Sequence, residues 1–115
     1  MRAIDLDRGS EVVTRGRMAK TFWARLAGLL GTPPLQPGEG LLLEPCNSIH
    51  MFFMTYPIDA IYLDGDNVVL RIAPRLAPWR IGPTVRRGRR VLELPAGQAD
   101  RCGVQVGDRF VFAEA

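Results

Sequence analysis

The chain has 115 residues, a length typical of one domain, and we expect residues 1–115 to fold around a single core. Apolar residues make up 47% of it and charged residues 23%, which excludes a disordered chain, a fibrous repeat and a coiled coil. No stretch approaches the ~20 apolar residues of a membrane-spanning helix, and acids stand near the N-terminus where a signal peptide needs an apolar run. These features predict a cytoplasmic protein without a transmembrane segment.

The net charge of +3 is unevenly distributed along the chain. Seven of the 15 basic residues and no acid lie between Arg71 and Arg90, so that segment carries +7. The rest of the chain has 8 basic and 12 acidic side chains, a net charge of −4. This asymmetry predicts one strongly positive face or loop.

One amphipathic helix is predicted at about residues 22–30, because apolar side chains recur there at helical spacing. Thr21 is the expected N-cap, and Gly31 followed by two prolines is expected to end the helix. The apolar stripe consists of Phe22, Leu26, Leu29 and Leu30.

The remaining elements are predicted to be short strands and turns. In the strand at 91–94, Leu92 and Leu94 are expected to lie opposite Val91 and Glu93. The other strands are predicted at 11–15, 41–44, 58–63, 68–72 and 109–112, with a single helical turn within 97–103.

The tight-turn composition at 64–67 predicts a hairpin of the strands that flank it. In its second arm, Val68, Leu70 and Ile72 are expected to share one face. Residues 74–88, rich in proline and glycine, form the longest irregular stretch. The predicted fold class is mainly β with an α+β tendency, a small β-sandwich or barrel-like domain with one packed N-terminal helix.

Cys46 and His50 lie in the densest group of chemically versatile residues, at 45–59. A metal site is not expected there, because residues four apart on an extended chain are about 13 Å apart and no second cluster supplies further ligands. No cofactor is expected either. Both Cys46 and Cys102 are expected to be unpaired thiols, since two cysteines are too few for a disulfide framework.

Two interpretations of this group remain open. Cys46 as thiolate and His50 as base, oriented by Asp59 or Glu93, would suit a small hydrolase or transferase. Alternatively, Cys46 fills the core and His50 bonds to the backbone or to Asp59. Asp59 alternates with Ile61 and Leu63, so its carboxylate should point to their apolar side and needs a partner such as His50 or an arginine.

The arginine-rich segment suggests an anion-binding surface. The planar guanidinium group can bind phosphate or carboxylate through two parallel hydrogen bonds, and a nearby Trp79 would suit single-stranded nucleic acid. An anionic ligand, an acidic protein partner, anionic lipid and nucleic acid all fit this charge, nucleic acid being possible but not favoured, and a solvated loop is the alternative. The residues concerned are Arg80, Arg86, Arg87, Arg89 and Arg90.

Six blocks of the chain, within about residues 11–113, resemble in order those of the domain-of-unknown-function family 192. The blocks are Arg25-Leu-Ala-Gly-Leu-Leu30, Gly38-Glu-Gly-Leu-Leu-Leu43, Cys46-Asn-Ser-Ile-His-Met-Phe-Phe-Met54, Pro57-Ile-Asp59, Pro78-Trp-Arg80 and Leu92-Glu-Leu-Pro-Ala-Gly97. The resemblance implies a small, mainly β, sandwich-like fold of bacteria and archaea, and no established activity. Positions that look characteristic of the family are Cys46, Ser48, His50, Met54, Asp59, Glu93, Gly97, Gly107 and Asp108.

The leading hypothesis is therefore a non-enzymatic module that binds a ligand or partner. A Cys/His-dependent enzyme and anion or nucleic-acid binding by the segment from Arg71 to Arg90 are the alternatives. The expected ligand-binding residues are Cys46, Ser48, His50, Asp59 and Glu93.

Overall fold

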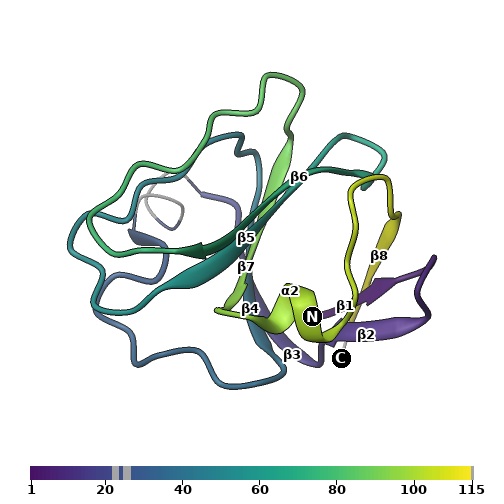
Figure 1. Ribbon diagram of the computed structural model, residues 1–115, viewed down its shortest axis with the longest axis horizontal. Coiled ribbons are helices and arrows are strands. Elements are labelled where there is room, and N and C mark those ends of the chain that lie inside the picture. The colour runs from purple at the N-terminus through teal and green to yellow at the C-terminus, as the bar shows by residue number, and fades with distance from the viewer. Residues whose placement is uncertain (22–23, 25–26, 115) are drawn as a thin grey trace.

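The computed structural model describes residues 1–21, 24 and 27–114, which form two β-sheets (Figure 1). The larger sheet has the strand order β3-β4-β7-β5-β6 and the smaller one β2-β1-β8. This arrangement confirms the predicted mainly β fold. The elements are β1 (Arg2–Asp5), β2 (Ser10–Val13), β3 (Arg15–Ala19), β4 (Glu39–Leu43), β5 (Ile58–Leu63), β6 (Val69–Leu76), β7 (Arg90–Pro95), α2 (Gln98–Arg101) and β8 (Phe110–Ala113).

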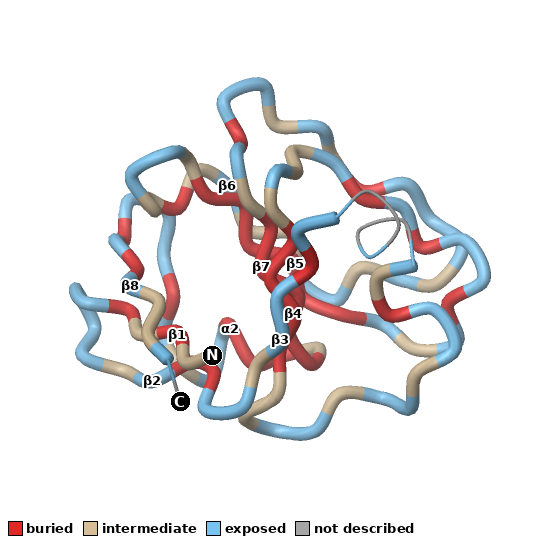
Figure 2. The backbone as a smooth tube through the Cα atoms, turned by 180° about the vertical axis from the view of Figure 1, so that it is seen from behind, coloured by how far each residue is buried: buried red, intermediate tan, exposed pale blue. Residues whose placement is uncertain are grey.

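The three central strands of the larger sheet, β4, β7 and β5, are buried on both faces and appear red in Figure 2. Every residue of β5 is buried. Because side chains alternate along a strand, Ile61 and Leu63 pack toward the smaller sheet, whereas Ile58, Ala60 and Tyr62 pack on the other side. One sheet thus separates two hydrophobic cores.

The smaller sheet is formed by strands from both ends of the chain, β1 and β2 from the N-terminal end and β8 from the C-terminal end. Its central strand β1 pairs antiparallel with both β2 and β8, and the two termini lie beside it (Figure 1). The helix α2 contributes Ala99 to the core between the sheets. The second core is covered on its outer side by irregular segments instead, and the candidate site lies among these.

Most predicted strands are confirmed within a few residues, but β1 and β3 were not predicted. The single strand predicted at 11–15 is two strands, β2 and β3, which end and begin on either side of Thr14. β3 has no run of apolar residues from which a strand could be predicted, because it is an edge strand, parallel to β4, with three of its five residues exposed. An exposed edge needs no apolar run.

Two expectations for β6 are wrong. Val69 and Ile72 pack against the same core although they are three residues apart, because the pairing register between β5 and β6 shifts near Leu63. Such a bulge reverses the alternation on which the predicted faces depended. The strand also continues through Pro74, predicted to be irregular, since an edge strand tolerates the missing N–H of proline.

The helix predicted at 22–30 falls partly on residues 22, 23, 25 and 26, which lie outside the described residues. Thr21 Oγ1 accepts a hydrogen bond from the Ala24 N–H (3.0 Å), the contact expected of an N-cap. In the part of the chain that the structure describes, no helix is long and apolar enough to cross a membrane.

Candidate functional site

A cavity of about 220 Å³ lies on the outer face of the larger sheet. Leu43 of β4 and Glu93 of β7 contribute to its lining from the sheet, and residues 27–30 and 46–54 contribute the rest. Its surface is mainly apolar. The polar side chains that reach it are Cys46, Ser48, His50 and Glu93.

Glu93 is a buried carboxyl group in the middle of this sheet. β7 is flanked by β4 and β5, and the residues paired with Glu93 are Leu41 and Ala60, so its neighbours on that face are apolar. Glu93 is 5% exposed, and no described residue gives its carboxyl a hydrogen bond or an ion pair. Burial raises the pKa of Glu93 to about 7. At neutral pH the cavity therefore holds a carboxyl group that exchanges readily between acid and carboxylate.

Cys46 and His50 border the same cavity with different exposure. Cys46 is half-buried, and its Sγ donates a hydrogen bond to the carbonyl of Ser48 (3.0 Å). His50 is exposed, and its Nδ1 accepts a hydrogen bond from the Phe52 N–H (3.3 Å). The predicted bond from His50 to the backbone is confirmed, and Cys46 and Cys102 form no disulfide.

The segment 46–54 is held in place by the segment 79–89. Met51 exchanges two backbone hydrogen bonds with it, donating to the carbonyl of Arg80 and accepting from the N–H of Trp79, both at 2.7 Å. Further bonds join Gly82 to Ile49 and Val85 to Asn47, each at 2.9 Å. The group at 46–54 and part of the arginine-rich segment therefore lie side by side.

Asp59 does not belong to this cavity. Its side chain points to the opposite face of the sheet, as its alternation with Ile61 and Leu63 predicted. Its partners, however, are neither His50 nor a guanidinium group. Its Oδ1 accepts from the Arg75 N–H (2.8 Å) and its Oδ2 from the Ala99 N–H (2.9 Å). Of the five expected ligand-binding residues, the structure brings four together and separates Asp59.

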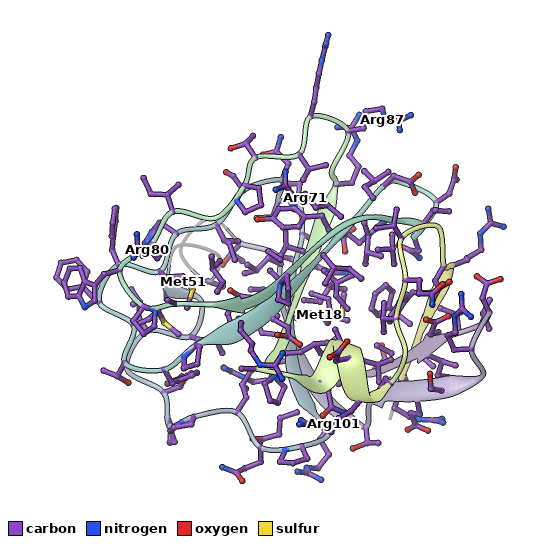
Figure 3. The ribbon with its side chains drawn as sticks, in the orientation of Figure 1. Met18, Met51, Arg71, Arg80, Arg87 and Arg101 are labelled. Atoms are coloured by element: carbon purple, nitrogen blue, oxygen red, sulfur yellow. The ribbon has the colours of Figure 1, made fainter. Side chains whose placement is uncertain are left out.

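The arginine-rich segment divides into exposed and structural residues. Arg80 and Arg87 lie at different ends of this loop region in Figure 3, and Arg86 and Arg89 are also exposed. Arg90, predicted to bind anions, is a residue of β7 instead. Its guanidinium donates to Glu44 (3.2 Å) and to Asn67 Oδ1 (2.9 Å), so it serves the fold.

Comparison with known proteins supports the resemblance found in the sequence. The model of one protein family, DUF192, described as uncharacterised, matches residues 4–112. The chain belongs to the DUF192 family. Membership of this family does not assign an activity to the chain.

Archaeal and bacterial proteins are similar to this DUF192 chain. A UPF0127 protein of Thermococcus sibiricus is 33% identical to the chain, in an alignment that covers 93% of the chain and 71% of that protein. A UPF0127 protein of Pyrococcus furiosus is 30% identical, and the alignment covers 93% of the chain and 94% of that protein. A crystal structure of a Novosphingobium aromaticivorans protein of unknown function matches the fold with a TM-score of 0.84 and 26% sequence identity. The match covers 96% of this chain and 82% of that one. A crystal structure of a Sinorhizobium meliloti protein, described as a candidate transcription regulator, matches with a TM-score of 0.81 and 26% sequence identity. The match covers 96% of this chain and 89% of that one.

Sequence reasoning missed a second acidic group in this DUF192 chain, at the smaller sheet, in which Asp5 and Asp108 are buried and Asp7 is exposed. Carboxyl oxygens of Asp5, Asp7 and Asp108 lie within 4.8 Å of one another, and Arg8 binds Asp108 (3.1 Å). Burial, followed by the hydrogen bond to Asp108, raises the pKa of Asp5 to about 6. Burial opposes ionisation of Asp108 as well, but hydrogen bonds from Arg8 and Asp5 lower its pKa to about 2. Because Asp5 and Asp108 are far apart along the chain, no local pattern could have linked them.

Proposed function

We propose that the chain is a non-enzymatic binding module whose cavity takes a small, partly apolar molecule that carries a hydrogen-bond donor. The observation that carries this proposal is Glu93, a buried carboxyl group without a partner among the described residues that lines a cavity. A buried polar group without a hydrogen bond costs free energy, and a ligand that donates to it would recover that cost.

The lining of the cavity supports this choice of ligand. Leu29, Leu43 and Ile49 would contact an apolar portion, while Glu93 would accept from a primary amine, an amide or a hydroxyl group. A carboxylate ligand is disfavoured, since it would compete with Glu93 for the same proton. The volume of about 220 Å³ suits a molecule somewhat larger than benzene, which fills a cavity of about 150 Å³.

A Cys/His-dependent enzyme is the first alternative. It would require Cys46 to be a thiolate, a form that accepts hydrogen bonds and is stabilised by a neighbouring cation. The Cys46 sulfur instead donates to the Ser48 carbonyl, and His50 uses Nδ1 for the Phe52 N–H. Neither of these hydrogen bonds links Cys46 to His50, which favours a binding role.

The proposal is tested by titrating the ¹⁵N-labelled protein with n-butylamine, n-butanamide and butyrate, followed by NMR. These probes share an apolar chain and differ in the polar group offered to Glu93. We expect the amine and the amide to shift the amide signals of residues 46–54, and butyrate to leave them unchanged.

The matched variants are Glu93→Gln and Val106→Asn. Gln keeps the shape of Glu93 but cannot carry negative charge, so binding of n-butylamine should weaken by about tenfold or more. Val106, exposed and absent from the cavity lining, provides a control that should bind normally. The proposal fails if no probe perturbs the cavity or if Glu93→Gln binds the amine as well as the original chain does.

Nucleic-acid binding is the second alternative, supported by the exposed Arg86, Arg87 and Arg89 and by the description of the Sinorhizobium meliloti protein. It predicts affinity for DNA that falls steeply with salt and is lost when these three arginines are changed to Glu. Arg90→Glu is not a suitable variant, because Arg90 is bound to Glu44.

A further inference from the structure

Large apolar side chains project into solvent beside the cavity, from the two loops that run side by side. They are Phe52, Phe53, Trp79 and Ile81, which we call the aromatic tip. Phe53 is 70% exposed, Trp79 58% and Ile81 73%. The ring of Trp79 lies 4.8 Å from that of Phe53 and 6.3 Å from that of Phe52, so the three rings form one contiguous surface, and Ile81 lies two residues from Trp79 along the chain. Contiguous exposed apolar surface of this kind usually marks a place where another surface binds.

The backbone under the two most prominent rings is strained. Phe53 has φ 65° and Trp79 has φ 66°, in the left-handed region that bulky residues rarely adopt. Gly or Asn would adopt this conformation at lower cost. The rings are also too exposed for their burial to offset the strain. Their presence in this conformation therefore favours a function for the rings outside the fold.

The two loops that carry the tip contain no acidic residue, and the second of them is rich in arginine. No acid occurs at 45–58 or at 67–92, whereas Arg80 lies between two residues of the tip and is exposed. Figure 3 places Arg80 at the same end of the molecule as Met51. Further along the same loop, Arg86, Arg87 and Arg89 are exposed as well. An apolar tip that carries the exposed Arg80, on a chain segment with a net positive charge, is complementary to an anionic membrane surface.

We propose that the aromatic tip docks the chain on anionic lipid membranes. Phe53, Trp79 and Ile81 enter the boundary between headgroups and acyl chains, and Arg80 pairs with lipid phosphate. A membrane fits this surface better than single-stranded nucleic acid does. Ile81, the most exposed member, has no ring to stack on a base, and the Phe53 and Trp79 rings pack against each other at 59° rather than offering parallel faces.

Docking in this way would bring the cavity to the lipid surface. His50 lines the cavity, and its ring lies 5.3 Å from the ring of Phe52 in the tip. The lining of the cavity therefore adjoins the surface proposed to touch lipid. The docking proposal itself does not depend on what the cavity binds.

The test is co-sedimentation with vesicles of phosphatidylcholine containing roughly a third phosphatidylglycerol, compared with vesicles of phosphatidylcholine alone. We expect partitioning onto the anionic vesicles, weakened by salt. The double variant Phe53→Asn/Trp79→Asn should bind about tenfold more weakly or worse, because Asn accepts the left-handed backbone but lacks the apolar surface. Thermal unfolding of this variant verifies that it is folded.

The matched control is Leu6→Asn/Val106→Asn, which removes two exposed apolar side chains, 55% and 63% exposed, outside the tip. It should bind vesicles as the original chain does. Absence of binding to anionic vesicles would overturn the proposal, as would an equal loss in both double variants. Tip-dependent binding of single-stranded oligothymidylate without vesicle binding, or tip-dependent dimerisation in sedimentation analysis, would also overturn it.

Discussion

Asp59 and Ala99 connect the larger sheet to α2 through one buried hydrogen bond, from the Ala99 N–H to Asp59 Oδ2 (2.9 Å). The other oxygen of Asp59 accepts from the Arg75 N–H (2.8 Å) in the edge strand β6. One carboxylate on β5 thereby fixes two segments that are distant from it along the chain. Its position in the core indicates a structural role for this residue, which the sequence had suggested as a site residue.

Asp59→Ala should destabilise the fold by about 3 kcal/mol, because it leaves the buried Ala99 N–H without an acceptor. Asp59→Asn should cost less, since its remaining oxygen can still accept one bond. Urea unfolding measures both values. A loss below about 0.5 kcal/mol for Asp59→Ala would contradict the structural role.

Glu93 should make the fold less stable as the pH rises. Its pKa is raised from 4.5 to about 7 in the folded chain, so the folded state binds the proton more tightly than the unfolded state does. The stabilisation is complete below the unfolded pKa and is lost as the pH rises through about 7. Its size is on the order of 3 kcal/mol.

Glu93→Gln is the variant that measures this effect. Gln does not titrate, so its free energy of unfolding should exceed that of the original chain increasingly from about pH 5 to about pH 8. Urea unfolding at these two pH values provides the comparison. If the free energy of unfolding changed equally with pH in the two proteins, ionisation of Glu93 would not destabilise the fold.

Asp5 and Asp108 should respond in opposite directions to the same isosteric change. The pKa of Asp5 is raised from 3.8 to about 6, so its contribution to stability is lost as the pH rises through about 6, and Asp5→Asn should stabilise the fold above that pH. The pKa of Asp108 is lowered from 3.8 to about 2, so its contribution is present above 3.8 and is lost as the pH falls through about 2.

Asp108→Asn should therefore destabilise the fold at neutral pH, because it weakens the ion pair with Arg8. Thermal unfolding at pH about 7.5 compares the two variants, with shifts of roughly 1–2 kcal/mol expected in each direction. If both variants were stabilised, or both destabilised, the result would contradict the conclusion that Asp108 is the more readily ionised member of the pair.

Cys46 and Cys102 should both react slowly with iodoacetamide near neutral pH. Burial raises the pKa of the Cys102 thiol, and the Cys46 sulfur donates to the Ser48 carbonyl. Peptide mass spectrometry of the native and the urea-unfolded protein gives the two rates. Selective, rapid alkylation of Cys46 would favour the enzyme alternative over the binding module.

Local pattern was sufficient for part of the candidate site. Alternation in β7 predicted that Glu93 shares a face with Val91, and alternation in β5 predicted that Asp59 shares a face with Ile61 and Leu63. Taken together, these faces argue against a site that contains both carboxyl groups. That conclusion needed the pairing of β5 with β7, in which Ala60 lies opposite Glu93, and strand pairing is not encoded locally.

The sequence by itself determined most of the strand segments (β1 and β3 excepted), the turn at 64–67 and the faces of β5 and β7, because these depend on the alternation of side chains and on turn chemistry over a few residues. Only the tertiary structure decided which segments meet. It joined the loop with Cys46 and His50 to the loop with Trp79 and Arg80, and it brought Asp5 next to Asp108. Such contacts depend on the packing of two sheets and on long-range pairing, which no short window of residues specifies.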